Sequence, residues 1–205
     1  LSLAELQAAN QDISLDQALF NGFYPRVYQD KLNSTQAYRD YFKTYVERDV
    51  RQLINIKDLS LFEKFMRLCA GRAGTILNIS QLSNDVGISA HTLEQWLSLL
   101  EASFILYKLP PYYENFGKRV IKSPKIYFID VGLLMYLLGI EDIKQLSRDP
   151  LRGNWVENLV VMELVKARLN HNHDPNLYYF RDNHQHEVDV IFKCGSELIP
   201  IEIKA

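Results

Sequence analysis

The C-terminal quarter of the chain most restricts its fold, because charged residues interrupt two otherwise apolar strand-like segments. Residues 187–192 and 198–204 are mainly apolar, and within them residues 187–190 and 201–204 alternate between polar and apolar side chains, as half-buried strands do. This alternation places Glu202 and Lys204 on the same side of the last strand. Charges within such strands are unfavourable unless they are paired, hydrated or bound to a metal. We therefore expect a sheet that brings Asp189, Glu202 and Lys204 onto one face.

Two acids beside a lysine form a set suited to metal-assisted phosphodiester cleavage. Magnesium prefers oxygen ligands and keeps several waters, so Asp189, Glu202 and a backbone carbonyl would form a partial shell for Mg²⁺ or Mn²⁺. The ion would polarise the scissile phosphate and lower the pKa of a bound water, which Lys204 would steer or deprotonate. A salt bridge from Lys204 to one of these acids, within an inactive site, is the competing interpretation.

Glu157 belongs to a segment whose apolar spacing predicts a helix over residues 154–169. We expect it in the first helical turn, and two roles are open for it there. It joins Asp189 and Glu202 as a metal ligand, or its negative charge only complements the partial positive charge of the helix N-terminus.

Length, charge and cysteine content limit the classes of protein to consider. At 205 residues the chain fits one large or two small domains, and its pattern favours two. Its net charge of -2 requires that any contact with DNA use a local basic patch. Two cysteines do not make a disulfide framework, so a reducing cytoplasm is expected. The sequence has neither a long apolar run nor a secretory signal, which predicts no membrane partner.

The middle of the chain has the pattern of a winged helix. Residues 79–100 read as two helices joined by a glycine turn, with Ser89 capping the second, and residues 104–109 and 126–129 read as wing strands. The second helix contains no lysine or arginine that would contact phosphate. We expect DNA contact, if present, from the cations between the wing strands, and a protein-interaction role is the alternative. These cations are Lys118, Arg119, Lys122 and Lys125.

At Asp189, Glu202 and Lys204 the sequence resembles the PD-(D/E)XK nuclease-like superfamily, whose acids hold a divalent cation and whose lysine assists the attacking water. Longer phrases resemble the C-terminal half of a prokaryotic family of predicted AAA-type ATPases. In that family a P-loop ATPase domain precedes a domain of unknown function that contains a winged helix and a nuclease-like core. The matching phrases are residues 22–26, 45–50, 97–103, 115–119, 130–134 and 154–161.

This resemblance implies four segments along the chain. They are the tail of a missing ATPase module over residues 1–33, a helical connector over 34–74, a winged-helix domain over 75–146, and a nuclease-like domain over 147–205 that is incomplete at its C-terminus. The Walker segments are absent, so ATP would bind only through the missing N-terminal ATPase domain.

Arg26 is the residue of the first segment to which the resemblance gives a role. The resemblance implies that Arg26 approaches a nucleotide bound by the ATPase module. The alternative is that Arg26 has only a structural role beside Pro25. The chain starts without methionine and stops in mid-strand, so we expect a piece of a longer protein.

The expected fold is α+β, with a mainly helical N-terminal part that includes the winged helix-turn-helix, followed by an α/β nuclease-like core. The leading hypothesis is the C-terminal region of an AAA-type ATPase that handles DNA. The alternative is a non-catalytic interaction or regulatory module with a degenerate nuclease fold. Assembly into a homo-oligomer is left open.

Overall fold

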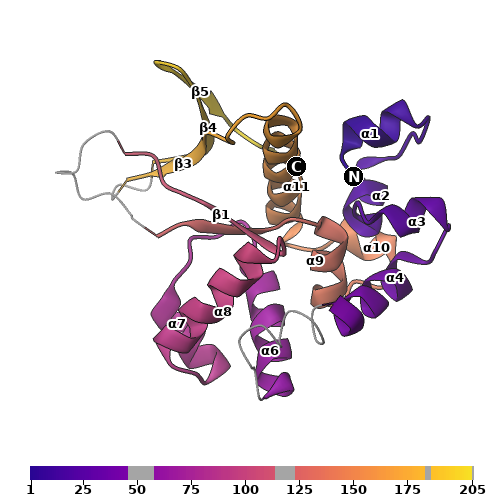
Figure 1. The fold of residues 1–205 in the computed structure, drawn as a ribbon, viewed down its shortest axis with the longest axis horizontal. Helices are drawn as coiled ribbons and strands as arrows, with labels where there is room; N and C mark the ends of the chain where they lie inside the picture. The colour runs from indigo at the N-terminus through magenta and orange to yellow at the C-terminus, as the bar shows by residue number, and fades with distance from the viewer. Residues whose placement is uncertain (46–57, 114–122, 183–185, 205) are drawn as a thin grey trace.

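The computed structural model describes residues 1–45, 58–113, 123–182 and 186–204, which form a mixed α+β fold (Figure 1). The first part is helical, as expected, and three of the four helices described there begin after a polar residue that supplies a cap. Ser2, Ser14 and Asn33 accept hydrogen bonds from the backbone three residues on. These helices are α1 (Leu3–Ala8), α2 (Leu15–Asn21), α3 (Pro25–Gln29) and α4 (Ser34–Tyr41).

A helix-turn-helix follows at the expected place. Ser89 accepts a hydrogen bond from the amide of Thr92, and Gly87 adopts the left-handed conformation that the turn requires (φ 94°). Asp58 caps the preceding helix, because its carboxylate accepts a hydrogen bond from the amide of Leu61. The three helices are α6 (Leu59–Ala70), α7 (Ile79–Val86) and α8 (Ala90–Ala102).

Two antiparallel strands, β1 (Leu106–Leu109) and β2 (Lys125–Phe128), come next, with Leu106 opposite Phe128. Asp130 then caps α9 (Val131–Leu138), and Gly139 ends it in the left-handed conformation. The remaining helices are α10 (Ile143–Leu146) and α11 (Arg152–Asn170). Among the described helices, none has the length and apolar composition needed to cross a membrane.

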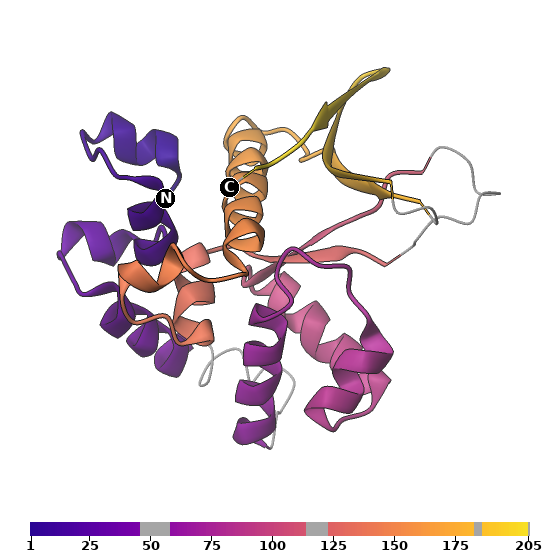
Figure 2. The ribbon, with the colours of Figure 1, turned by 180° about the vertical axis from the view of Figure 1, so that it is seen from behind.

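The second sheet is built from three consecutive antiparallel strands in the order β3-β4-β5. They are β3 (Leu177–Arg181), β4 (Glu187–Cys194) and β5 (Glu197–Ile201). A parallel bridge between Pro111 and Tyr179 connects the chain leaving β1 to β3. Helix α11 lies between the N-terminal helices and this sheet in both ribbon views (Figures 1 and 2).

Helix α11 and strand β2 each contribute to two apolar cores. Trp155 of α11 packs with Ile126 and Phe128 of β2 in the larger, helical core. Met162 of α11 and Tyr127 of β2 pack with β3 and β4 in the smaller core. The alternation of side chains along a strand explains why neighbouring residues of β2 enter different cores.

Asn158 fastens these two elements to each other. It is fully buried, and its amide exchanges two hydrogen bonds of 2.8 Å with the backbone of Phe128. The α11–β2 contact is therefore part of the interior of the molecule.

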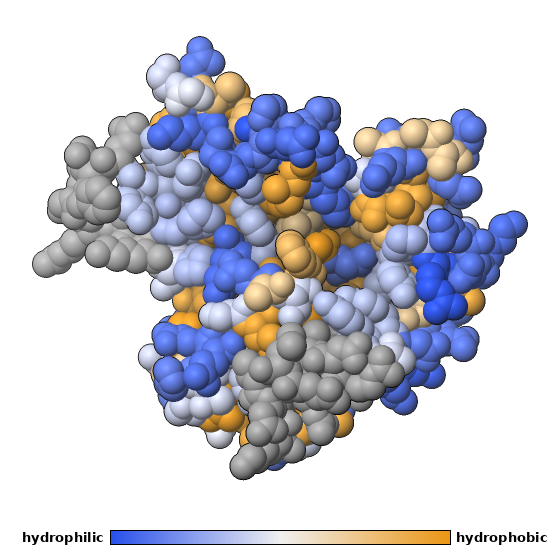
Figure 3. Space-filling model, in the orientation of Figure 1, coloured by the Kyte–Doolittle hydropathy of each residue, from blue (hydrophilic) through white to orange (hydrophobic). Residues whose placement is uncertain are grey.

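On the face seen in Figure 3, hydrophilic residues predominate, and apolar residues show at the centre, between the N-terminal helices and α11.

Asp130 also joins distant segments. Its carboxylate accepts hydrogen bonds from the hydroxyl of Tyr38 at 2.7 Å, the amide of Phe23 at 3.1 Å and the amide of Gly132 at 2.8 Å. Gly22 has a φ of 59°, and a Cβ there would overlap Tyr38, Asp130 and Gly132. Only glycine combines this conformation with so close an approach. Asp130 therefore has the structural role of a helix cap and an anchor for the N-terminal segment.

Candidate functional site

Glu157 lies in the second turn of α11, because this helix begins at Arg152 and not at residue 154. The expectation of a first-turn acid is corrected accordingly, and the helix-terminus role loses its basis. One oxygen, Oε1, accepts hydrogen bonds from the Tyr127 hydroxyl at 2.6 Å and from Lys125 Nζ at 3.0 Å. The side chain is only 15% exposed. Glu157 is thus held by two partners from strand β2.

Lys125 is the charged centre of this cluster. Its side chain is 3% exposed, and its ammonium also lies 2.7 Å from Oε1 of Glu187 on β4. Glu187 has a second partner in Arg181 of β3, at 3.4 Å. A buried lysine is tolerable only when its charge is compensated, and here two carboxylates do so.

Because Lys125 is buried and paired with two acids, the expectation that it contacts DNA phosphate is corrected. Side chains at alternate positions of a strand share a face, so Lys125 and Tyr127 both point toward α11. The other three cations proposed for DNA contact, Lys118, Arg119 and Lys122, lie outside the described residues.

The electrostatics of the cluster follow from burial and from the close charges. Burial raises the pKa of Glu157, although Lys125 and Tyr127 act against it, and the charge of Asp189 raises it further. Burial alone would lower the pKa of Lys125, but Glu157 and Glu187 outweigh it and raise this pKa. Burial and then Glu157 also raise the pKa of Tyr127. Lys125 is therefore charged at neutral pH, and Asp189 acts electrostatically on the cluster.

Asp189 is half-buried on β4, and its Oδ2 accepts a hydrogen bond from the amide of Ile203 at 2.9 Å. Strand β5 ends at Ile201, so the expected strand through residue 204 is shorter in the structure. Alternation nevertheless continues, since Glu202 and Lys204 are exposed and Ile203 is half-buried. The structure thus places the segment with Glu202 and Lys204 against Asp189.

The suitability of this cluster for a divalent cation rests on its chemistry. Within the described ranges, no three His, Cys, Asp or Glu side chains are arranged to hold a metal. Magnesium, however, commonly uses one or two carboxylates and completes its shell with water. The ammonium of Lys125 between Glu157 and Glu187 shows that these oxygens hold a positive charge. The donors therefore fit a hydrated Mg²⁺ or Mn²⁺ held by one or two carboxylates.

Arg26 lies apart from this cluster, on α3. Its Nε pairs with Asp30 Oδ2 at 3.0 Å, one helical turn away, and its side chain is 59% exposed. This is an ordinary surface pair. A nucleotide-sensing role for Arg26 stays a prediction.

The exposed face of α8 forms a shallow groove of about 570 Å³ lined by His91, Glu94, Gln95 and Ser98. The helix contains neither lysine nor arginine. Glu101, near its end, pairs with Lys108 of β1 at 2.8 Å. This face therefore offers no positive charge to a phosphate backbone.

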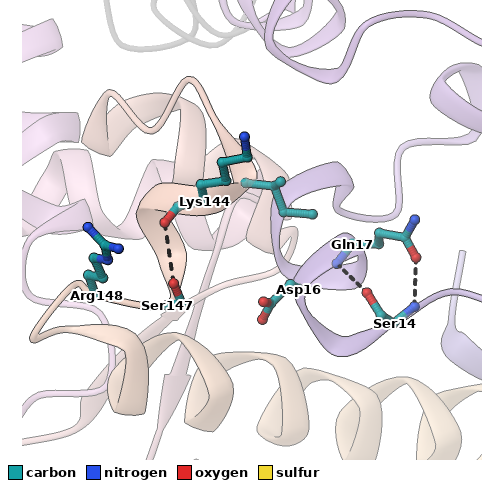
Figure 4. Close-up of a pocket in the computed structure, with 7 residues that line it drawn as sticks. Ser14, Asp16, Gln17, Lys144, Ser147 and Arg148 are labelled. Atoms are coloured by element: carbon teal, nitrogen blue, oxygen red, sulfur yellow. Dashed lines mark hydrogen bonds between the residues drawn. The ribbon is translucent and has the colours of Figure 1, made fainter.

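A recess of about 600 Å³ lies between α2 and α10 (Figure 4). Ser14 and Gln17 bond to each other as the cap of α2, and Ser147 bonds to the carbonyl of Lys144. The polar groups drawn with hydrogen bonds there complete the local helix ends. None of the residues proposed for the catalytic or DNA-binding sites lines this recess.

Three residues around the site were not predicted from the sequence to take part in it. They are Tyr127, Asn158 and Glu187. A weak signal existed for Tyr127, because it follows Lys125 by two positions and must share its face in a strand. In the sequence, Glu187 is only the first residue of the segment that carries Asp189. Its ion pairs depend on how β2 packs beside β4.

Comparisons with known proteins place the chain among uncharacterized proteins. A family model described as a domain of unknown function, DUF8612, matches residues 12–144, and a second, DUF4143, matches residues 152–205. DUF4143 is found in proteins associated with AAA ATPases. No solved structure shows significant similarity to the chain.

Uncharacterized proteins of Mycobacterium bovis and Mycobacterium tuberculosis are each 31% identical to the chain over 192 residues, which is 92% of this chain and 42% of theirs. An uncharacterized protein of Haemophilus influenzae is 28% identical over 153 residues, 72% of this chain and 36% of its own length. The chain therefore spans less than half the length of these relatives. Since the first family model covers most of it, the chain belongs to the DUF8612 family, with a DUF4143 segment following.

Proposed function

We propose that this chain is the C-terminal region of an AAA-type ATPase that handles DNA, and that residues 152–204 form a nuclease-like unit. The observation that carries the proposal is the hydrogen bond from the amide of Ile203 to Asp189, which holds the segment with Glu202 and Lys204 against this acid. The order of elements, one helix followed by three antiparallel strands, supports a PD-(D/E)XK-like core.

Each residue has a chemical role in this proposal. Asp189 and Glu202 would supply oxygen ligands for Mg²⁺ or Mn²⁺, and Glu157, on which the charge of Asp189 acts, would be a further ligand. A bound divalent cation supplies Lewis-acid activation of a phosphate and of water. Lys204 is exposed and follows Ile203, whose amide bonds to Asp189, and it would orient or deprotonate the attacking water.

The remainder of the chain supports a link to an ATPase and to DNA. The DUF4143 match favours a parent protein with an ATPase domain, through which ATP would bind. Helices α7 and α8 followed by β1 and β2 favour a winged helix. Since α8 has no basic side chain, DNA contact is assigned to Lys118, Arg119 and Lys122.

The nuclease activity is tested by nicking of supercoiled DNA with Mg²⁺ or Mn²⁺, using the full-length protein. Asp189→Asn and Lys204→Ala should abolish nicking. The exposed residues Asp12 and Lys193 offer matched controls, and Asp12→Asn and Lys193→Ala should leave it unchanged. Nicking that persists in Asp189→Asn at the original rate would exclude the assigned site.

DNA contact by the basic segment is tested separately by affinity against salt concentration. Lys118→Ala combined with Arg119→Ala should weaken binding and reduce the salt slope by about two, one for each lost phosphate contact. Lys64→Ala with Arg39→Ala removes the same charge from the helical part and should have no effect. An unchanged slope in the first double variant would remove these residues from the interface.

A second function is favoured by the pairing of Glu157. Because Lys125 and Tyr127 already occupy its Oε1, the nuclease-like unit would serve as a non-catalytic interaction or regulatory module. In that case the folded wild-type protein should nick DNA no faster than Asp189→Asn. A metal-dependent rate clearly above that background would reject this alternative.

A further inference from the structure

Lys125 connects two parts of the molecule through the candidate site. It belongs to β2, which packs on one face into the helical core, whereas its two acidic partners come from α11 and β4. We propose that Lys125 is the resident counter-cation of this site, and that a divalent cation reaches Glu157 only by displacing the ammonium. The inference rests on the proposed function in treating Glu157 as a metal ligand.

The geometry makes the two cations competitors. Lys125 Nζ lies 3.0 Å from Oε1 of Glu157, with 3% of the lysine side chain exposed. A divalent cation on the same carboxylate would place two positive groups within a few ångströms of each other in a region shielded from water. Their repulsion is strong there because little solvent screens it. Metal affinity should therefore depend on the position of Lys125.

The surrounding contacts would keep both acids in place after such an exchange. The Tyr127 hydroxyl bonds to Glu157 at 2.6 Å, and Arg181 lies 3.4 Å from Glu187. Each carboxylate thus has a second partner that is independent of Lys125. Displacement of the ammonium changes the ion at the site without leaving either acid alone.

Because β2 carries the lysine, the DUF8612 part controls a site whose acids lie in the DUF4143 part. Rotation of the Lys125 side chain away from Glu157 would free this carboxylate for a metal. Lys125 is therefore a positioning residue that sets metal affinity and takes no part in bond cleavage.

The test is calorimetric titration of the full chain with Mn²⁺, without DNA. Lys125→Met should bind Mn²⁺ about tenfold more tightly than the wild-type chain, the size of an ordinary coupling between two ligands. Lys108→Met is the matched control, since Lys108 lies on the adjacent strand β1, pairs with Glu101 of α8 and should not affect affinity. Adding Glu157→Gln to Lys125→Met should remove the gain.

Lys125→Arg keeps the charge and should bind Mn²⁺ as weakly as wild type. Equal affinity of wild type and Lys125→Met, or equally tight binding by Lys125→Arg and Lys125→Met, would overturn the proposal. If Lys125→Met is unfolded alone, millimolar Mn²⁺ should restore its cooperative melting, and failure to do so counts against the inference. The titration contains no DNA, so its outcome is independent of the nicking assay. If Lys125→Met gains Mn²⁺ affinity but the full-length protein does not nick DNA, only the proposed nuclease activity is refuted.

Discussion

Two half-buried acids, Asp130 and Glu157, illustrate two different uses of a carboxylate in this molecule. Each accepts a hydrogen bond from a tyrosine hydroxyl, Tyr38 at 2.7 Å and Tyr127 at 2.6 Å. The other donors to Asp130 are backbone amides, whereas the other donor to Glu157 is the ammonium of Lys125. The first acid is surrounded by neutral donors and the second is part of a charged network.

This difference separates a structural role from a candidate functional one. Backbone amides cannot leave Asp130 unless α9 or the N-terminal segment unfolds. A lysine side chain can exchange one partner for another by rotation about its bonds, because it is a flexible point charge. We expect substitutions near Asp130 to change stability alone, and substitutions near Glu157 to change stability, pH response and ion binding together.

The largest effect should come from the Asp130 side. Gly22→Ala places a Cβ against Tyr38, Asp130 and Gly132 at a positive φ, so we expect a loss of about 4 kcal/mol in the free energy of unfolding. Urea denaturation of the variant and the wild type measures this loss in unfolding free energy. Gly153→Ala is the control, because nothing lies near that Cβ and helix α11 should gain about 0.5–1 kcal/mol. A small loss in Gly22→Ala would show that the Asp130 junction is adaptable.

Removing the charge on the Glu157 side should cost somewhat less. Lys125→Met leaves Glu157 without its cation, and we expect a loss of about 3 kcal/mol in unfolding free energy. Lys108→Met, from the neighbouring and more exposed pair, should lose at most about 1 kcal/mol. Equal losses in the two variants, measured by denaturation at neutral pH, would mean that Lys125 has no special electrostatic role.

The two tyrosines permit a direct comparison of the sites. Tyr38→Phe should lose about 2 kcal/mol, because the hydroxyl also accepts from the amide of Tyr24, which would lose its acceptor. Tyr127→Phe should lose about 1 kcal/mol, because Lys125 still pairs with Glu157. The melting temperatures of Tyr38→Phe and Tyr127→Phe show which variant loses more stability. The reverse order would indicate that the hydroxyl of Tyr127 contributes more than the lysine.

Alkaline pH should act on the Glu157 side only. The pKa of Lys125 is raised in the folded state, so its stabilising contribution is complete below the usual lysine pKa of about 10.4 and is lost as the pH rises through the folded-state pKa. The difference in unfolding free energy between wild type and Lys125→Met should therefore shrink above that pH. Gly22→Ala should keep a constant difference from wild type over the same range.

The smallest effect is expected at Arg26. Its pair with Asp30 is exposed and lies within one helix, so Arg26→Ala should not measurably change the melting temperature. A clear change in nucleotide affinity of the full-length protein in this variant would instead support the predicted sensing role.

Features fixed by local chemistry were predictable from the sequence. The cap at Ser89, the turn at Gly87 and the alternation around Asp189 follow from short-range rules, and the structure confirms the helices and the strand that they predicted. Local rules were less accurate at a helix start, because α11 begins at Arg152, two residues earlier than expected.

The candidate site was only half predictable for a related reason. Asp189 and the segment of Glu202 and Lys204 are neighbours through consecutive strands, which the sequence order implies. The pairing of Lys125 with Glu157 joins residues 32 positions apart and depends on the docking of α11 beside β2. A lysine in isolation reads as a solvated charge, and only this packing makes it a buried one.

The sharing of α11 between two cores bears on how the protein can be divided. The DUF8612 match ends at residue 144 and the DUF4143 match begins at residue 152, which suggests a natural place to cut. Expressed separately, however, the first piece would expose the apolar surface that Trp155 covers, and the backbone of Phe128 would lose Asn158. The two matched segments share buried contacts, so we expect the separated pieces to be less stable than the intact chain.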